Sequence, residues 1–275
     1  MKIDSHQHFW KYNPTEYSWI SNEMNVLKKD FLPGDLFTEL TKYGMDSCIA
    51  VQARQCPEET RWLLELATQN DFIKAVVGWV DLCSGDVKSQ LDEFTQHRKF
   101  VGVRHVVHDE PDDNFILRDD FLNGISLLKN YSLTYDLLLF PKHLPVAERL
   151  VSMFPDQPFV LDHISKPLIR HKKIHPWKED LLRLAAHDNV FCKISGMVTE
   201  NDWQRRQMED YIPYLDIVFD AFGENRLMYG SDWPVCKVAG DYSHVLNVVE
   251  RYMEKMPEGV REKIIGLNCR EFYFK

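Results

Sequence analysis

Short apolar runs alternate eight times with longer segments whose apolar residues recur at helical spacing. The runs are rich in Val, Ile, Leu and aromatic residues on both faces, which is typical of parallel strands covered by helices. Eight such repeats in 275 residues predict a single-domain (β/α)8 TIM barrel of the α/β class over residues 1–275, with an open α/β sheet as the alternative. The predicted strands are residues 2–6, 47–53, 74–80, 100–107, 133–140, 158–164, 190–196 and 227–233.

Charge and cysteine usage exclude several kinds of partner. The net charge of −9 argues against nucleic acid, because binding to a polyanion calls for a basic surface. The longest apolar runs are far too short to span a bilayer, and no signal-peptide pattern opens the chain. Six cysteines lie scattered without a CxxC pair, as expected of reduced thiols. We therefore expect a cytoplasmic enzyme with a small-molecule substrate and no membrane partner; the sequence leaves its oligomeric state open.

Two histidines end the first predicted strand. His6 and His8 are separated by one residue, and side chains two apart in a strand point to the same face. Both imidazoles should therefore face the mouth of the barrel, where TIM-barrel active sites are built. The pair is suited to holding one metal ion or to gripping a polar substrate.

Two further polar residues end later strands. Asp232, in Gly230-Ser231-Asp232-Trp233-Pro234, closes the eighth predicted strand. Its carboxylate could ligate a metal, accept a proton from water, or cap the following helix. His163 ends the sixth strand, and strand alternation predicts that only one of Asp162 and His163 faces inward.

These strand ends together resemble the amidohydrolase superfamily, in which they carry metal ligands and a water-activating aspartate. The resemblance spans the chain and is strongest in four motifs, which look like those of the sugar lactonases, the branch with enzymes for L-fucono- and L-rhamnonolactone. It implies hydrolysis of an aldonolactone to the free acid. The motifs are Gly102-Val103-Arg104-His105-Val106-Val107-His108-Asp109-Glu110-Pro111, Asp162-His163-Ile164-Ser165-Lys166-Pro167, Lys193-Ile194-Ser195-Gly196 and Gly230-Ser231-Asp232-Trp233-Pro234.

The sequence departs from the two-metal members of that superfamily. Those members carry a bridging lysine or glutamate on strand four and a histidine on strand five, whereas this chain has Arg104-His105 and Tyr135-Asp136 there. The remaining ligand set of His6, His8, His163 and Asp232 suits one Zn²⁺ or a similar divalent ion with an open position for water. A mechanism without metal, in which Asp232 activates water directly, stays open because related lactonases include members that need none.

Lactone hydrolysis assigns roles to the other strand-end residues. Asp232 and His163 would activate water, while Arg104 or His105 would stabilise the oxyanion. Residues 9–32 and 197–211 form long aromatic and polar connections after strands one and seven and are expected to cover the substrate. The remaining candidates for substrate binding are Gln52, Trp79, Asp136, His143, Lys166 and Trp203.

Two other functions compete with the lactonase. One is a metal-dependent decarboxylase, because some barrels of the same superfamily decarboxylate aromatic acids with a similar ligand set. The other is a non-catalytic carbohydrate-binding protein. The second is disfavoured because ionisable residues gathered at four strand ends cost desolvation energy unless they are paired or used.

Overall fold

The structure, a computed structural model, describes residues 1–274. Eight parallel strands follow one another in sequence order around a barrel, each hydrogen-bonded to the next, which confirms the predicted fold and its eight strands. They are β1 (Ile3–Gln7), β2 (Ser47–Val51), β3 (Ile73–Gly78), β4 (Phe100–Val106), β5 (Thr134–Leu138), β6 (Phe159–Leu161), β7 (Val190–Ile194) and β8 (Leu227–Tyr229).

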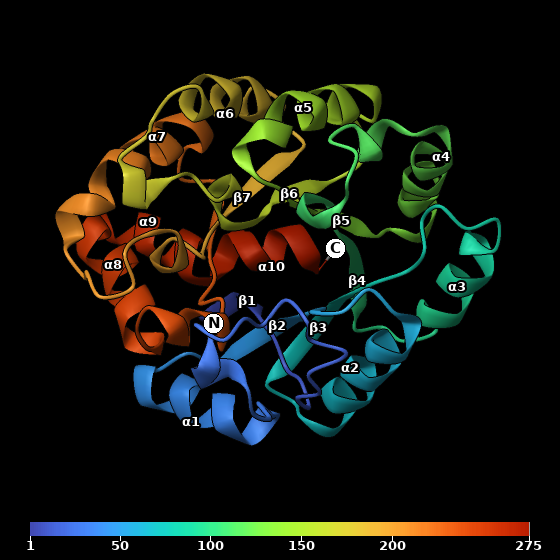
Figure 1. Ribbon diagram of the computed structural model, residues 1–275, viewed down its shortest axis with the longest axis horizontal. Helices are drawn as coiled ribbons and strands as arrows, with labels where there is room; N and C mark the ends of the chain where they lie inside the picture. Colours follow the sequence, from blue (N-terminus) through green and yellow to red (C-terminus); the bar gives the residue numbers. More distant parts are fainter. Residues whose placement is uncertain (275) are drawn as a thin grey trace.

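Helices α1 to α8 each follow the strand of the same number and form the outer ring in Figure 1. A π-helical turn, Lys263–Leu267, joins the last two helices. The helices are α1 (Pro33–Tyr43), α2 (Pro57–Gln69), α3 (Val87–Phe94), α4 (Asp119–Leu128), α5 (Leu144–Met153), α6 (Trp177–Ala185), α7 (Ile212–Phe222), α8 (Tyr242–Met253), α9 (Glu258–Glu262) and α10 (Asn268–Tyr273). No helix within residues 1–274 is both long and apolar enough to cross a membrane.

The barrel closes between β8 and β1 largely through residues just beyond β8. The backbone N–H of His8 donates to the carbonyl of Trp233 at 2.7 Å, and that of Asp232 donates to the carbonyl of His6 at 2.8 Å. The buried carboxylate of Asp4 accepts the N–H of Ser231 at 2.9 Å. Because β8 is only three residues long, these bonds complete the ring where the regular strand has ended.

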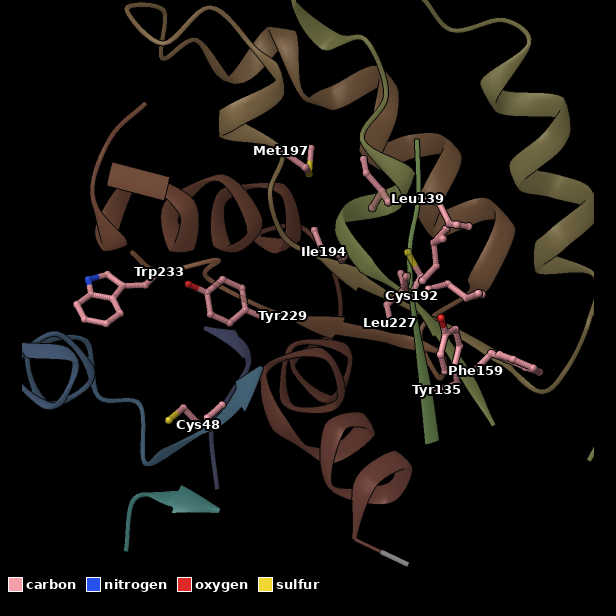
Figure 2. Close-up of a cluster of buried hydrophobic side chains, with 14 of the residues drawn as sticks. Cys48, Tyr135, Leu139, Phe159, Cys192, Ile194, Met197, Leu227, Tyr229 and Trp233 are labelled. Atoms are coloured by element: carbon pink, nitrogen blue, oxygen red, sulfur yellow. The ribbon is translucent and has the colours of Figure 1, made fainter. Parts of the chain in front are cut away.

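The strand side chains divide between two apolar cores according to the pleat. One face packs against the ring of helices, and Figure 2 shows Tyr135, Phe159, Cys192 and Leu227 gathered there. The other face fills the barrel with a smaller apolar cluster, to which α10 adds three side chains. The strand residues of that inner cluster are Ile3, Ile49, Val51, Ala75, Val77, Val160 and Met228.

Helix α10 lies across the centre of the ring in Figure 1 and packs into the inner cluster. Cys269, Phe272 and Tyr273 come from this helix, and all three are buried. Their strand contacts include Ile3 near the start of β1. The helix therefore plugs the amino end of the barrel and leaves its carboxyl end for the site.

Gly124 in helix α4 packs closely against the backbone of Leu82. A methyl group at Gly124 would lie 2.3 Å from the backbone carbonyl oxygen of Leu82, whereas one at Gly34 in α1 would meet nothing within 4 Å. We expect Gly124→Ala to lower the free energy of unfolding by about 1–3 kcal/mol, since the overpacking outweighs the helical preference of alanine. Gly34→Ala should leave stability equal or higher, and equal urea midpoints for the two variants would contradict this packing.

Candidate active site

Four predicted residues meet at the carboxyl end of the barrel. The Nε2 atoms of His6 and His8 are 3.2 Å apart, and the Nε2 of His8 is 3.4 Å from Oδ1 of Asp232. The Nε2 of His163 is 3.9 Å from the same oxygen. All four side chains are buried, so the three imidazoles and the carboxylate form one compact polar centre.

Hydrogen bonds on the far side of each ring set the orientation of two histidines. The Nδ1 of His8 lies 2.8 Å from the carbonyl oxygen of Val51. Since a carbonyl only accepts, Nδ1 carries the proton and Nε2 presents its lone pair to the centre. The Nδ1 of His163 similarly contacts the hydroxyl of Ser195 at 2.8 Å, which leaves Nε2 directed towards Asp232.

The alternation expected of Asp162 and His163 is wrong. Strand β6 ends at Leu161, and the backbone then takes positive φ at four successive residues, from His163 (55°) to Lys166 (49°). Because a left-handed backbone does not follow the pleat, both side chains turn towards the centre. Asp162 comes within 3.3 Å of His6 Nδ1.

Two glycines make room for the histidine rings. A methyl group at Gly196, whose φ is +63°, would lie 2.6 Å from the ring of His163. One at Gly230 would lie 2.6 Å from Cβ of His6. No side chain is accommodated at such distances, so each glycine is needed for a site histidine to sit where it does.

Burial sets the protonation of the centre. Burial lowers the pKa of His163 to about 3. Burial also lowers the pKa of His6 well below its usual value, because its effect exceeds the opposite effect of the nearby Asp162. Burial alone would raise the pKa of Asp232, but His163 and the hydrogen bond with His8 bring that pKa below its usual value. At neutral pH His6 and His163 are therefore neutral imidazoles and Asp232 is an ionised carboxylate, the forms that bind metal.

The donor atoms of His6, His8 and Asp232 lie within 4.8 Å of one another and fit one zinc ion. Two ligands at about 2.05 Å from zinc and at the tetrahedral angle lie about 3.3 Å apart. The spacings of 3.2 Å between His6 and His8 and 3.4 Å between His8 and Asp232 match this value. Nitrogen and carboxylate donors suit zinc, and the hydrogen bond from His8 Nδ1 to a backbone carbonyl is the support that zinc-binding histidines usually have.

Two buried cations lie beside the carboxylates next to the centre. Arg104, on β4, contacts Asp162 at 3.0 Å and places Nη1 3.3 Å from His6 Nε2. Lys193, fully buried on β7, contacts the carboxylates of Asp136 and Asp162. The carboxylates available next to His6 are therefore already paired inside the protein, in line with the single-metal expectation.

The sequence interpretation missed Asp162, Lys193 and Ser195 as parts of the centre. A lysine inside a strand that is apolar on both faces was the available signal, because lysine is almost never fully buried without a partner. The partners of Lys193 come from β5 and from the residue after β6, and the pattern of a single strand does not reveal them.

A cavity of about 450 Å³ opens above the centre. The predicted residues His8, Arg104, His163, Lys166, Trp203 and Asp232 line it. Both long connections contribute walls, Trp19 and Met24 from the first, and Thr199, Glu200 and Trp203 from the second. The other lining residues are Ala53, Val106, His108, Asp109, Leu138, Phe140, Val235 and Val238.

The structure does not bring His105 or Trp79 to this cavity. Arg104 faces the barrel, so the pleat turns His105 outward, where its ring stacks on Phe115 with centroids 4.9 Å apart. His105 also contacts Glu110 at 2.7 Å and accepts the indole N–H of Trp79. Its hydrogen-bonding capacity is therefore used among neighbours in the outer layer.

Three other candidates also lie outside the cavity wall. Gln52 is buried beside Arg104, which donates to its backbone carbonyl. Asp136 lies deeper in the barrel, where both carboxylate oxygens accept from the hydroxyl of Tyr273. His143 accepts the backbone N–H of Phe140 and so holds the turn after β5. These three residues contact other parts of the protein and do not line the cavity.

Comparison with known proteins places the chain. The sequence model of the amidohydrolase family matches residues 3–275. The chain belongs to this family. A Burkholderia multivorans protein named L-fucono-1,5-lactonase is 39% identical over 92% of this amidohydrolase and 89% of its own length. One of the same name from Burkholderia ambifaria is 34% identical over 99% and 95%.

A solved structure carries a metal in the same fold. The crystal structure of a Burkholderia multivorans amidohydrolase with bound zinc superposes on this one with a TM-score of 0.97 and 38% identity. The match covers 100% of this chain and 99% of the other. A relative at this similarity therefore binds zinc, the metal that the donor set here fits.

The glycine beneath His163 generates a test of this geometry. Gly196→Ala should weaken zinc binding by at least about tenfold, because the added methyl group displaces a ring whose placement supports the metal. Gly223→Ala is the matched control: it also has φ +63°, but nothing lies within 4 Å of the added carbon. Both variants should lose about 1–3 kcal/mol of stability, because each holds a residue in a sparsely populated region of φ and ψ. Only the first should lose affinity in a chelator-competition titration. Equal zinc affinities would show that Gly196 does not position the ring.

Proposed function

We propose that this amidohydrolase opens a sugar lactone, L-fucono-1,5-lactone or L-rhamnonolactone, to the free aldonic acid. The observation that carries the proposal is the buried, ionised carboxylate of Asp232, set between His8 and His163 on the floor of a cavity of about 450 Å³. That volume is within the range of small-molecule sites. The names of the two Burkholderia relatives supply the substrate class.

Asp232 is suited to act as the general base. Hydrolysis requires removal of a proton from the attacking water as its oxygen bonds to the lactone carbonyl carbon. The carboxylate takes that proton and returns it to the ring oxygen when the C–O bond breaks, which leaves the open-chain acid. A zinc ion held by His6, His8, His163 and Asp232 would supply Lewis acidity and lower the pKa of water.

Arg104 is suited to stabilise the negative charge that develops on the carbonyl oxygen. It lines the cavity, and its Nε–H is buried without a hydrogen-bond partner in the described chain. Asp162 and the carbonyl of Gln52 fix the other end of the guanidinium. A donor held in place before reaction stabilises an oxyanion without the cost of reorganisation.

The cavity walls suit a sugar ring. Trp19 and Trp203 offer aromatic faces, and Lys166 and Glu200, 3.3 Å apart, offer hydrogen bonds to hydroxyls. Aromatic faces pack against the C–H faces of sugars, while charged groups select the hydroxyl pattern. We also propose a cytoplasmic location, supported by the six free cysteines.

A lactone panel tests the proposal. Purified protein should release acid from L-fucono-1,5-lactone faster than from lactones that differ in the methyl group or in one hydroxyl. Asp232→Asn should reduce kcat by about 10²–10⁴-fold, the usual contribution of a general base. His171→Ala, at an exposed position away from the cavity, is the control and should match the wild type. Release of carbon dioxide from aromatic carboxylates, with no acid from any lactone, would establish the decarboxylase instead.

The pH dependence follows from the lowered pKa of Asp232. A general base works when deprotonated, so activity is lost only when the pH falls through its pKa in the folded protein. Because that pKa lies below the usual value of 3.8, kcat/KM should stay level from about pH 8 down to about pH 5, once spontaneous lactone opening is subtracted. A midpoint near pH 6 would show that another group, with a raised pKa, is the base.

A further inference from the structure

Glu59 is a buried carboxylate to which neither the mechanism above nor the sequence prediction gives a role. It lies in the first turn of α2. Its Oε2 accepts the backbone N–H groups of Ala53 and Arg54, each at 2.8 Å, and its Oε1 accepts the hydroxyl of Tyr17 at 3.3 Å. None of these three bonds goes to the backbone of α2. The carboxylate therefore ties the loop after β2 to the first long connection, residues 9–32.

The bond to Ala53 reaches the candidate active site through a single peptide group. The carbonyl of Gln52 and the N–H of Ala53 belong to one planar unit and point in opposite directions. Glu59 accepts from the N–H, while Arg104 donates through Nη2 to the carbonyl. A shift of the N–H end would therefore turn the carbonyl that holds Arg104.

The backbone leaves the sheet just before the peptide group that Glu59 holds. Strand β2 ends one residue before Gln52, whose N–H donates to the carbonyl of Val77 at 2.8 Å. The next two N–H groups along the chain, those of Ala53 and Arg54, both go to Glu59. Because buried backbone groups are rarely left without a partner, the carboxylate takes over from the strand ladder at the point where the ladder stops.

The bonds to the backbone do not require that Glu59 be charged. Burial raises its pKa to about 7, against the opposite effect of the N–H groups of Arg54 and Ala53. A proton on Oε1 can be donated to the hydroxyl oxygen of Tyr17, which leaves Oε2 free to accept both N–H groups. The peptide group is therefore held in either form, and the level pH profile expected from Asp232 is not disturbed.

We propose that Glu59 is a positioning residue of this active site, which fixes the peptide group between Gln52 and Ala53 and thereby the guanidinium of Arg104. Asp162 holds Nη1 of that guanidinium directly at 3.0 Å, and Glu59 holds Nη2 through the peptide group. The inference deepens the proposed function and rests on it for the part that Arg104 plays in catalysis. A misplacement of about 1 Å can cost about 100-fold in rate, so a residue one peptide group away bears on kcat.

Two substitutions of Glu59 separate hydrogen bonding from charge. Glu59→Met keeps the length of the side chain but cannot accept the N–H of Ala53, so kcat for L-fucono-1,5-lactone should fall by about 10–100-fold, with a smaller change in KM. Glu59→Gln keeps a carbonyl oxygen for the two N–H groups and can donate its amide to Tyr17, so kcat should stay near the wild-type value. A fall in Glu59→Gln as large as in Glu59→Met would overturn the proposal.

Tyr17→Phe is the matched control for the other bond of Glu59. Tyr17 is buried and does not line the cavity, and the substitution removes its bond to Glu59 without touching the peptide group. The variant should keep the wild-type kcat. An equal fall in Tyr17→Phe and Glu59→Met would mean that Glu59 acts through the first long connection, contrary to the proposal.

Crystal structures of the variants test the same point without any substrate. The guanidinium of Arg104 should be displaced in Glu59→Met and unmoved in Glu59→Gln. That result supports the positioning role even if no lactone is opened, so the inference and the proposed function can fail separately. An unmoved guanidinium in Glu59→Met would refute the inference. If Glu59→Met does not fold, Glu59→Asp replaces it, because a carboxylate one carbon shorter keeps the charge and loses the reach; wild-type kcat and an unmoved Arg104 in that variant would refute the inference equally.

Discussion

The junction of β8 with β1 is the contact on which the site depends. Asp232 donates its backbone N–H to the carbonyl of His6 at 2.8 Å, so the bond that closes the barrel also fixes the distance between carboxylate and imidazoles. Asp4 adds a buried carboxylate that accepts from Ser231 on the closing segment. A shift at this junction would move the proposed base relative to His8, because both are fixed by the same backbone bonds. Closure of the sheet and assembly of the centre are therefore one event.

The barrel interior is layered by polarity. The apolar plug from α10 fills the amino end, the paired charges of Asp136, Lys193, Asp162 and Arg104 lie above it, and the histidines lie above those. The positions of the charged side chains are restricted, because buried ions need counter-ions at fixed positions. Arg104 and Lys193 already pair with the carboxylates next to His6, so these are not free to hold a second metal ion.

Features that follow from the periodicity of strands could be predicted from the sequence. The prediction failed where the backbone no longer has strand geometry. Eight apolar runs gave the barrel, and the two-residue spacing of His6 and His8 placed both imidazoles on one face. The expectation for Asp162 and His163 failed because β6 ends at Leu161 and non-glycine residues then adopt positive φ, a state that residue type does not announce.

Two predicted site residues, His105 and Asp136, lie outside the cavity in the structure, for reasons that their local sequence does not show. His105 was a candidate because it follows Arg104, yet adjacent strand residues face opposite sides of the sheet. Asp136 was assigned to substrate, but its oxygens accept from Tyr273, 137 residues further along the chain. Such pairings are set by how α10 enters the barrel, which depends on packing and leaves no local pattern at either residue.

The closing junction also has a consequence for biosynthesis. A ribosome releases β1 with His6 and His8 first, and Asp232 emerges only after seven more strands have been made. Until then β1 has an unpaired edge, and such edges are prone to pair with other chains. The nascent chain also holds only part of its donor set, so it should bind zinc weakly throughout elongation. Metal loading is therefore expected only after the last strand has joined the first, on a finished barrel.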